Sequence, residues 1–294
     1  TDRPRLSGNR IWALPETSYG ESFEEKLVRL RDEMAKRSVD YHLITGLEEN
    51  AWLYNLRGSD VDRSPIFFSF TLISPDSVTL YKFGEDFDDI LKENGVTVKH
   101  YLDIFEDIKK LPDSATVLAD FDAASYSLIK SIPASCKITD DLSPVSMFKS
   151  IKNCAEIAAT REAHMYDGLA MVNFIYWLKN TVGKQALTEI SASDHLESLR
   201  SAQPGFVDLS FDTIAGYMSN GAIIHYGATP ESDTTLEADG FMLVDSGGQY
   251  LKGTTDITRT IALGSLTDKM KEYYTAVLRG HLDLAMAKFK AGTT

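Results

Sequence analysis

GFMLVDSGGQYLKGTTDITRTIAL, residues 240–263, is the stretch that decides the fold of the second half of this chain. Two β-prone runs flank a turn signal at Lys252-Gly253, which predicts an antiparallel hairpin. Each run carries one aspartate, Asp245 or Asp256. If the strands pair symmetrically about the bond between residues 250 and 251, the two aspartates are directly opposed and point to the same face.

Two opposed carboxylates on a half-buried face repel each other, so something must compensate for their charge. The residues leave three compensations open: a shared proton, an ion pair with Arg259, or one or two divalent cations, which prefer hard oxygen ligands. A shared proton is typical of Asp-Thr-Gly loops rather than strands. A bulge at Gly247-Gly248 would shift the register and change this geometry.

Length and composition limit the classes of protein to which this chain can belong. The chain has 294 residues, 43% of them apolar and 25% charged, which favours a globular protein of two domains. A formal charge of −13 argues against a nucleic-acid partner. No apolar run is long enough to predict a membrane span, and the N-terminus lacks the features of a signal peptide. Cys136 and Cys154 sit in no CxxC spacing, which favours a reduced intracellular pair.

The first half alternates helix-like and strand-like stretches, which predicts an α/β domain. Ser22 and Glu25 form a capping-box signature, so a helix is expected to begin there. Predicted strands are DYHLITG, PIFFSFTLISP, SVTLYKF, VTVKHY and ATVLADF, with helices at FDDILKEN and YSLIKSI. The stretch around Pro144 has no sustained period and is expected to be a linker.

The second half reads as α+β. A long helix is expected at about residues 154–181, a shorter one after Thr188, and a last one from about Thr267 to Lys290. Between them lie the β-like stretches VDLSFDTIAGY, GAIIHYG, GFMLVDSGGQY and TTDITRTIAL. His195 and His281 fall on predicted helices and are expected at the surface.

LVDSGGQYLKGTTDITRT closely resembles the metal-binding hairpin of the pita-bread metallopeptidases, and within them the long, three-domain Xaa-Pro aminopeptidases (aminopeptidase P). The similarity extends to VDLSFDTI, NGAIIHYG, LTEISASDHLESLR and AWLYNLRGSDVDRSPIFF, and so covers nearly the whole chain. It implies a creatinase/prolidase-like α/β N-terminal domain, followed by the first half of an α+β pita-bread catalytic domain.

Carried to the matching positions, the resemblance implies that Asp245 and Asp256 bind two divalent cations, with Asp256 bridging both. Manganese is the first expectation, with Zn²⁺ and Co²⁺ as alternatives. His225 matches a histidine that contacts the substrate near the scissile bond, which gives it a catalytic and substrate-binding role. From the residues alone, His225 is a strand histidine with satisfied hydrogen bonds. Arg57 has two open interpretations, a residue facing the cleft or a structural cap.

The implied function is a hydrolase that removes the first residue from peptides with proline second, through a water activated by two metals. The resemblance also implies a cytoplasmic enzyme that is a homodimer when intact, with no nucleic-acid or membrane partner. A prolidase acting on dipeptides is the nearest alternative. A non-catalytic pita-bread module that binds proteins is the alternative of a different class, and the presence of Asp245 and Asp256 argues against it.

A complete site in this family has three more ligands, a histidine and two glutamates, in a later segment that begins in a motif resembling HGTGHGVG. This sequence contains no such segment, so a middle fragment is expected, and its activity alone is an open question. The expected parts are a lead-in from an upstream domain (1–21), the α/β domain (22–145), a linker (146–154) and the first half of the pita-bread domain (155–294).

Overall fold

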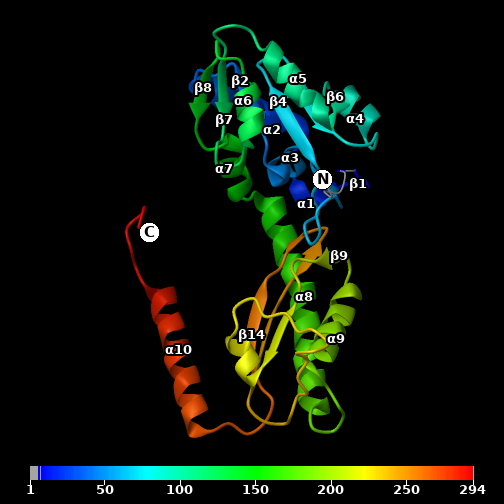
Figure 1. The fold of residues 1–294 in the computed structure, drawn as a ribbon, viewed down its shortest axis with the longest axis vertical. Coiled ribbons are helices and arrows are strands. Elements are labelled where there is room, and N and C mark those ends of the chain that lie inside the picture. The colour runs from blue at the N-terminus through cyan, green and yellow to red at the C-terminus, as the bar shows by residue number, and fades with distance from the viewer. Residues whose placement is uncertain (1–5, 7, 294) are drawn as a thin grey trace. The chain divides into compact units, whose positions relative to one another are not determined.

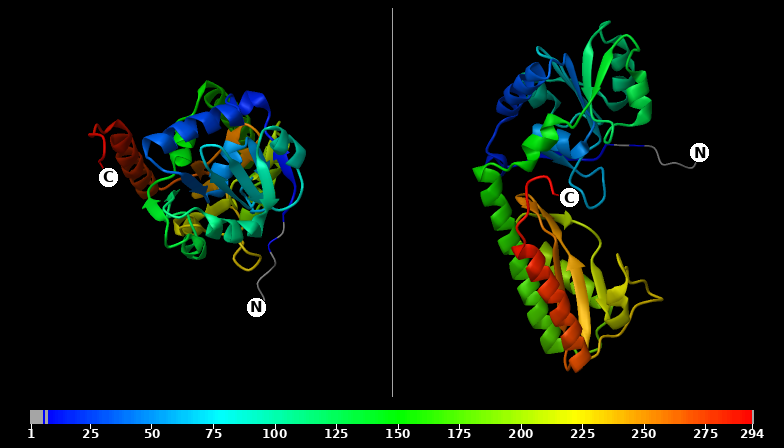
Figure 2. Two further views of the ribbon diagram at one scale, coloured as in Figure 1. Left: turned by 90° about the horizontal axis from the view of Figure 1, so that it is seen from above. Right: turned by 90° about the vertical axis from the view of Figure 1, so that its left-hand side faces the viewer.

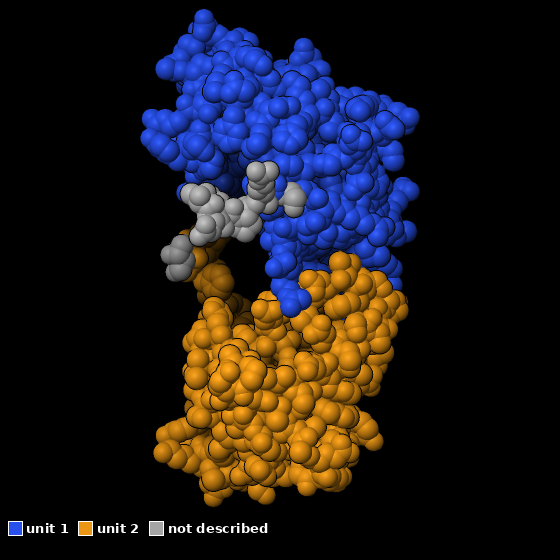
Figure 3. All heavy atoms as spheres, turned by 45° about the vertical axis from the view of Figure 1, so that its right-hand side comes forward, with its two compact units in different colours: residues 1–163, 249–253 blue, residues 164–248, 254–294 orange. Residues whose placement is uncertain are grey.

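The structure is a computed structural model that describes residue 6 and residues 8–293. The chain forms two compact units, coloured separately in Figure 3. Unit 1 comprises Thr1–Ala163 and Gln249–Gly253, and unit 2 comprises His164–Gly248 and Thr254–Thr294. Residues 1–5 of the predicted lead-in, and residue 7, lie outside the described residues. The domain boundaries given above stay a prediction.

A six-stranded mixed sheet organises unit 1 (Figure 1). Its order is β6-β5-β4-β2-β7-β8, and the pairs β5–β6, β2–β7 and β7–β8 are parallel. The five strands predicted for this half are confirmed, and the edge strand β8 was not predicted. The strands are β2 (Tyr41–Ile44), β4 (Ser69–Ile73), β5 (Val78–Lys82), β6 (Thr97–His100), β7 (Thr116–Ala119) and β8 (Lys137–Asp140).

Helices cover both faces of this sheet, so unit 1 has two hydrophobic cores. Because side chains alternate along a strand, Leu43 of β2 joins one core and Ile44 joins the other. This three-layer arrangement confirms the predicted α/β class. The helices are α1 (Glu16–Tyr19), α2 (Phe23–Lys36), α3 (Leu47–Leu53), α4 (Asp88–Glu93), η1 (Tyr101–Asp103), α5 (Ile104–Asp107), η2 (Ile108–Lys110), α6 (Tyr126–Ser131) and α7 (Pro144–Ser150).

Two stretches for which no helix or strand was predicted are ordered. Within the lead-in, β1 (Ile11–Ala13) pairs with β3 (Leu56–Gly58), and α1 follows. The expected linker contains α7, which begins with Pro144 in its first turn and has Ser143 as its N-cap. Proline is compatible with the first turn of a helix, where its missing N–H has no partner to lose. Pro144 therefore starts a helix here, and the prediction of an irregular linker was wrong.

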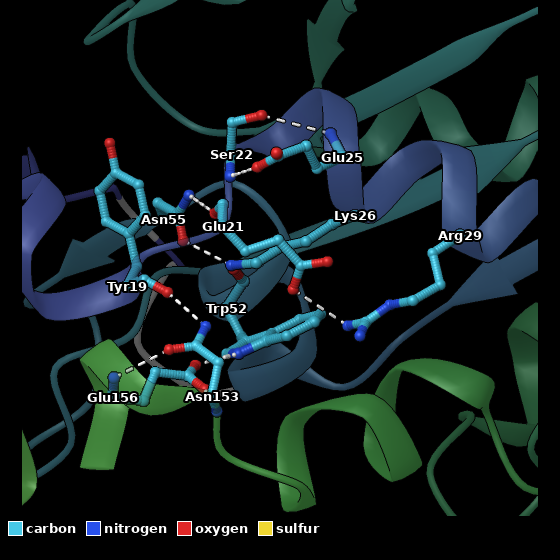
Figure 4. A network of polar contacts seen from close by, with 10 residues as sticks. All are labelled: Tyr19, Glu21, Ser22, Glu25, Lys26, Arg29, Trp52, Asn55, Asn153 and Glu156. Atoms are coloured by element: carbon cyan, nitrogen blue, oxygen red, sulfur yellow. Dashed lines mark hydrogen bonds and ion pairs between the residues drawn. The ribbon is translucent and has the colours of Figure 1, made fainter. Parts of the chain in front are cut away.

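A buried lysine lies at the centre of a polar network in unit 1 (Figure 4). α2 begins at the predicted capping box, with Ser22 and Glu25 bonded reciprocally. One turn further, Lys26 is fully buried, and its Nζ donates to the carbonyl of Trp52 at 2.7 Å and to Asn55 Oδ1 at 2.5 Å. The ammonium also lies 4.0 Å from the centre of the Trp52 ring, a cation–π geometry.

The same network extends to the start of the long helix α8 (Cys154–Thr181). The indole Nε1 of Trp52 donates to Glu156 Oε1 at 2.8 Å, and Asn153 and Glu156 cap each other's backbone amides. Burial lowers the pKa of Lys26 to about 8, although the Coulomb attraction of Glu156 and Glu21 opposes this shift. Unit 1 therefore carries a costly cation between α2, α3 and α8.

In unit 2, a three-stranded antiparallel sheet of order β10-β11-β14 packs with α8 and α9 (Glu189–Ser201) (Figures 1 and 2). Met242 and Val244 of β11 are buried in the shared core with Phe174 and Leu196 of the two helices. The alternate residues of β11 point to the other face of the sheet. The strands are β10 (Ile214–Tyr217), β11 (Phe241–Ser246) and β14 (Ile257–Ala262).

The remaining elements of the second half follow most of the predictions. Short strands β9 (Phe206–Leu209), β12 (Gly248–Tyr250) and β13 (Gly253–Thr254) form a second sheet in the order β13-β12-β9. Helix α10 (Asp268–Met286) begins at Thr267 as predicted, and all of its residues are solvent-accessible. GAIIHYG is not a strand, because η3 (Met218–Ala222) and a turn occupy it. In the part of the chain that is described, none of the helices combines the length and apolar character that a membrane span requires.

The predicted hairpin exists, but its predicted register is wrong. Asp245 is paired with Thr258 rather than with Asp256. The turn lies at Leu251 and Lys252, between β12 and β13, so the pairing is centred one residue later along the chain than predicted. The strand is also interrupted at Gly247, between β11 and β12, where the carbonyl of Thr255 and the hydroxyl of Ser210 occupy the space that a side chain would need. Beyond the break, Thr255 N donates to the carbonyl of Gly248 at 2.9 Å. The Gly248–Thr255 pair continues the register of Ser246 and Ile257, so the interruption at Gly247 does not shift the pairing, and the bulge that the sequence left open is not the cause.

The tip of the hairpin belongs to unit 1. Gln249 Nε2 donates to the carbonyl of Arg63 at 2.9 Å, and Lys252 Nζ lies 2.6 Å from Glu162 Oε2. Both partners are assigned to unit 1, as are residues Gln249–Gly253 themselves. The chain therefore leaves unit 2 for five residues and then returns.

The burial of Lys26 predicts that the protein becomes more stable as the pH rises into the alkaline range. The folded-state pKa of Lys26 is about 8 against 10.5 for a free lysine, so between these values the unfolded chain binds more protons. The unfolding free energy should therefore rise with pH in this window, relative to Lys26→Met, by on the order of 3 kcal/mol. Urea unfolding of both proteins at pH 7 and pH 10 measures this. The exposed Lys269→Met is the control, and a wild-type minus Lys26→Met difference that stays constant with pH would contradict the prediction.

The break at residue 247 predicts that only glycine is tolerated there. Gly247→Ala should lower the free energy of unfolding by about 1–3 kcal/mol, since a Cβ would overlap the Thr255 carbonyl. Gly168→Ala in α8 is the matched control, because a Cβ at that position would meet none of the described atoms within 4 Å and alanine favours helix. Denaturant titration compares the two variants, and equal stability of both would show that the hairpin accommodates a side chain at 247.

Candidate metal and substrate site

The two aspartates lie on neighbouring strands of the central sheet of unit 2. Asp245 is the second-last residue of β11, and it is half-buried. Its Oδ1 accepts a hydrogen bond of 2.8 Å from Thr258 Oγ1 on β14. Asp256 immediately precedes β14 and is exposed to solvent. The fold thus brings together two carboxylates that are 11 positions apart in the sequence.

Their relative placement follows from the observed register. Ser246 pairs with Ile257, so continuing by one pair places Asp256 opposite Gly247. Asp245 and Asp256 are then diagonal neighbours rather than directly opposed, and by strand alternation they share a face. That face is the one opposite to Met242 and Val244, which pack with the helices. The carboxylates therefore lie on the side of the sheet that faces away from α8 and α9.

The ion-pair alternative with Arg259 is not what the structure shows. Arg259 pairs with Val244, so by alternation it points to the other face from Asp245. Its Nη1 donates to the carbonyl of Thr258 at 2.8 Å. The hydroxyl of Thr258, rather than a cation on β14, is therefore the group that contacts the Asp245 carboxylate.

The donor set fits part of a metal site. Carboxylate oxygens on one face are hard ligands that suit Mn²⁺ or a similar divalent cation. Within residue 6 and residues 8–293, however, no group of three or more His, Cys, Asp or Glu side chains is arranged to hold a metal ion. Two carboxylates supply fewer ligands than a divalent cation requires, so the described residues alone do not make a complete metal site.

His225 lies in an exposed turn after η3, not in a strand as predicted. Its backbone has a φ of 55°, in the left-handed region that few residues other than glycine adopt. The preceding Ile224 is 84% exposed, whereas the following Tyr226 is buried. A strained backbone of this kind is held by its surroundings and is often found at functional sites. Among the described contacts, no hydrogen bond joins His225 to Asp245 or Asp256.

Other residues raised by the sequence have structural roles. Arg57 Nη1 donates to the carbonyl of Ala51 in the last turn of α3 at 3.2 Å, which supports the capping interpretation, and burial lowers its pKa to about 10. His195 is stacked on Trp177 with ring centroids 3.8 Å apart, so it is not a simple surface residue, and burial lowers its pKa. His281 is exposed on α10 as expected, and both cysteines are free.

One buried residue near His225 was not predicted. Glu189 is the first residue of α9 and is fully buried, and its carboxylate accepts hydrogen bonds from the segment that carries His225. The local signal was a glutamate directly after the N-cap Thr188, which suits the positive end of the helix dipole. That signal does not reveal the partners, because they lie 28 or more positions further along the chain.

Two family models match the chain. Residues 2–156 match the Creatinase/Prolidase N-terminal domain, and residues 158–294 match Metallopeptidase family M24. Among curated proteins, the chain is 39% identical over 310 residues to the probable Xaa-Pro aminopeptidase P of Paracoccidioides brasiliensis strain Pb03, covering all of this chain and 50% of that protein. The chain thus spans about half the length of the curated relatives it matches.

Solved structures give the same result. The X-prolyl aminopeptidase of Caenorhabditis elegans, described as a cytosolic enzyme with a di-nuclear active site, has a TM-score of 0.90 and 29% identity, covering 99% of this chain and 49% of that one. The Xaa-Pro dipeptidase of Bacillus anthracis has a TM-score of 0.71 and 25% identity, covering 93% and 74%. The predicted fold class is confirmed, and the chain belongs to the creatinase/prolidase N-terminal family and continues into an M24 metallopeptidase domain.

Proposed function

We propose that this chain is part of a metal-dependent aminopeptidase that removes the first residue from peptides with proline in second position. The observation that carries the proposal is the pair of carboxylates, Asp245 and Asp256, on the open face of the M24 sheet. The relatives named Xaa-Pro aminopeptidase support the substrate class. We place the protein in the cytoplasm as a homodimer, and the location is supported by the cytosolic C. elegans relative.

Asp245 and Asp256 would hold two divalent cations, manganese first, with further ligands from outside the described residues. When bound, the cations would supply a water of lowered pKa and polarise the scissile carbonyl. Thr258 would orient Asp245 by donating to its Oδ1, which leaves the other oxygen free for coordination. The position of Arg259 on the opposite face keeps its charge from competing for Asp245.

His225 would contact the substrate near the scissile bond. This residue is exposed, in a turn whose backbone is fixed by its surroundings. Its imidazole can therefore donate a hydrogen bond to the peptide carbonyl as negative charge develops there. Ile223 and Ile224, which are 54% and 84% exposed, place apolar surface beside it. Such surface suits the pyrrolidine ring of a proline residue.

The assay that tests the function uses the full-length protein that contains this chain, with manganese present. We expect release of the first residue from Xaa-Pro-Yaa tripeptides, and little from Xaa-Ala-Yaa. Because a dipeptidase of known structure shares the fold, Xaa-Pro dipeptides are assayed in parallel. Cleavage of the dipeptides alone would replace the aminopeptidase with a prolidase, and cleavage of neither would favour a non-catalytic module.

Each aspartate should be required for metal binding. Asp245→Asn or Asp256→Asn in the full-length protein should lower Mn²⁺ affinity at least about tenfold, since loss of a ligand costs no less than loss of an outer-shell partner. Electron paramagnetic resonance of free Mn²⁺ during titration measures the affinity. Asp268→Asn, a fully exposed carboxylate on α10, is the control and should bind as the wild type does. Wild-type affinity in both variants would remove these residues from the site.

His225 should act on turnover rather than on metal content. His225→Ala should lower kcat/KM by about 10²–10³-fold, as expected for loss of a hydrogen-bond donor to the developing oxyanion. Manganese content should stay unchanged, because no metal role is assigned to this side chain. Steady-state kinetics and elemental analysis provide the two measurements, with His281→Ala on α10 as control. A loss of manganese in His225→Ala would instead make this residue a ligand.

A further inference from the structure

A single buried carboxylate, that of Glu189, accepts hydrogen bonds from several parts of the segment that carries His225. Glu189 Oε1 accepts from Tyr217 N at 2.6 Å and from Asn220 Nδ2 at 3.1 Å. Glu189 Oε2 accepts from Tyr226 Oη at 2.8 Å and from Thr234 N at 3.3 Å. These four donors span residues 217–234, so the carboxylate ties both ends of the segment and its middle to the start of α9.

The donors around Glu189 are all neutral. Among the described residues, no cation is paired with this fully buried carboxylate, which is compensated by hydrogen bonds and by the N-terminus of α9. Burying a charge in this way is costly for stability, and an apolar residue would fill the same space at lower cost. The arrangement is therefore better explained by what it holds in place than by the stability that it adds.

What it holds most directly is the backbone at His225. Residues 223–225 are exposed and His225 has a left-handed φ of 55°, a conformation that persists only where neighbouring contacts fix it. The next residue, Tyr226, is buried, and its hydroxyl is bonded to Glu189. The Tyr226 anchor is one residue from His225, so it sets the direction in which the imidazole leaves the turn.

We propose that Glu189 is a positioning residue, which fixes the turn of His225 through Tyr226 without touching the peptide. This inference rests on the proposed function for its catalytic meaning, but the positioning itself is a property of the chain. Glu189→Gln tests it closely, because one oxygen becomes an NH₂ group that cannot accept from Tyr226 or Thr234. Tyr226→Phe removes only the hydroxyl and keeps the ring in the core, so it tests the same contact if the first variant folds poorly.

The first measurement is spectroscopic and needs no metal or substrate. In the 294-residue chain, the intraresidue HN–Hα distance of His225, measured by the nuclear Overhauser effect, is shortest for a left-handed φ and so reports this conformation, and hydrogen exchange reports the amides of Tyr217 and Thr234. We expect this distance to lengthen toward a conformational average in Glu189→Gln and Tyr226→Phe, with exchange at least about tenfold faster in Glu189→Gln. Glu49→Gln is the matched control: it changes another buried carboxylate in the first turn of a helix, bonded to a hydroxyl in unit 1. An unchanged HN–Hα distance of His225 in both test variants would overturn the proposal.

The second measurement is a double-mutant cycle in the full-length protein. Glu189→Gln should lower kcat/KM about tenfold to a hundredfold alone, but less than about twofold in a His225→Ala background, because its effect passes through that residue. A loss of the same size in both backgrounds would mean a general structural effect and would overturn the proposal. If the wild-type protein cleaves no Xaa-Pro peptide, the proposed function fails, and the intraresidue HN–Hα distance of His225 still decides whether Glu189 positions the turn.

Discussion

The antiparallel pairing of β11 with β14 is the constraint on which the candidate site depends. β11 is the central strand, and its inward residues Met242 and Val244 anchor it to α8 and α9. Strand alternation then forces Asp245 to the opposite face, whatever else the chain does. The turn at Leu251 and Lys252 centres the pairing so that Asp245 lies opposite Thr258, which makes Asp256 a diagonal neighbour instead of a directly opposed one. The diagonal offset gives the two carboxylates more separation than direct opposition would.

Local signals in the sequence predicted the elements that depend on local chemistry. The capping box at Ser22 and Glu25, the long helix α8 and the start of α10 at Thr267 are confirmed because caps and periodicity act within a few residues. The register was predicted one residue out, because the turn signal at Lys252-Gly253 did not fix the turn to Leu251 and Lys252, where the structure has it. The apolar run before His225 was wrongly predicted as a strand for a different reason. Its conformation is decided by a distant carboxylate, Glu189, and not by its own β-propensity.

Lys26 and Glu189 are buried charges, and neither has a directly bonded counter-ion among the described residues. They illustrate two different uses of a buried charge, which is costly for stability. Lys26 donates to a carbonyl and an amide oxygen and lies against an indole ring, so it joins neighbouring helices of unit 1 through its several donors. Glu189 accepts from four donors on one segment of unit 2. The first arrangement connects elements that are already packed. The second fixes a surface turn that has little packing of its own, and that difference is why we assign only Glu189 a role in positioning the site.

The excursion of Gln249–Gly253 into unit 1 limits how such a protein can be recombined. A crossover between two related genes near the unit boundary at residue 163 would inherit the tip of the hairpin from one parent and its partners from the other. Gln249 would then meet a foreign backbone at position 63, and Lys252 a foreign residue at position 162. Viable chimeras should therefore preserve the acid–base match at 162 and 252. The hairpin that bears Asp245 therefore makes the two units co-inherited rather than freely interchangeable.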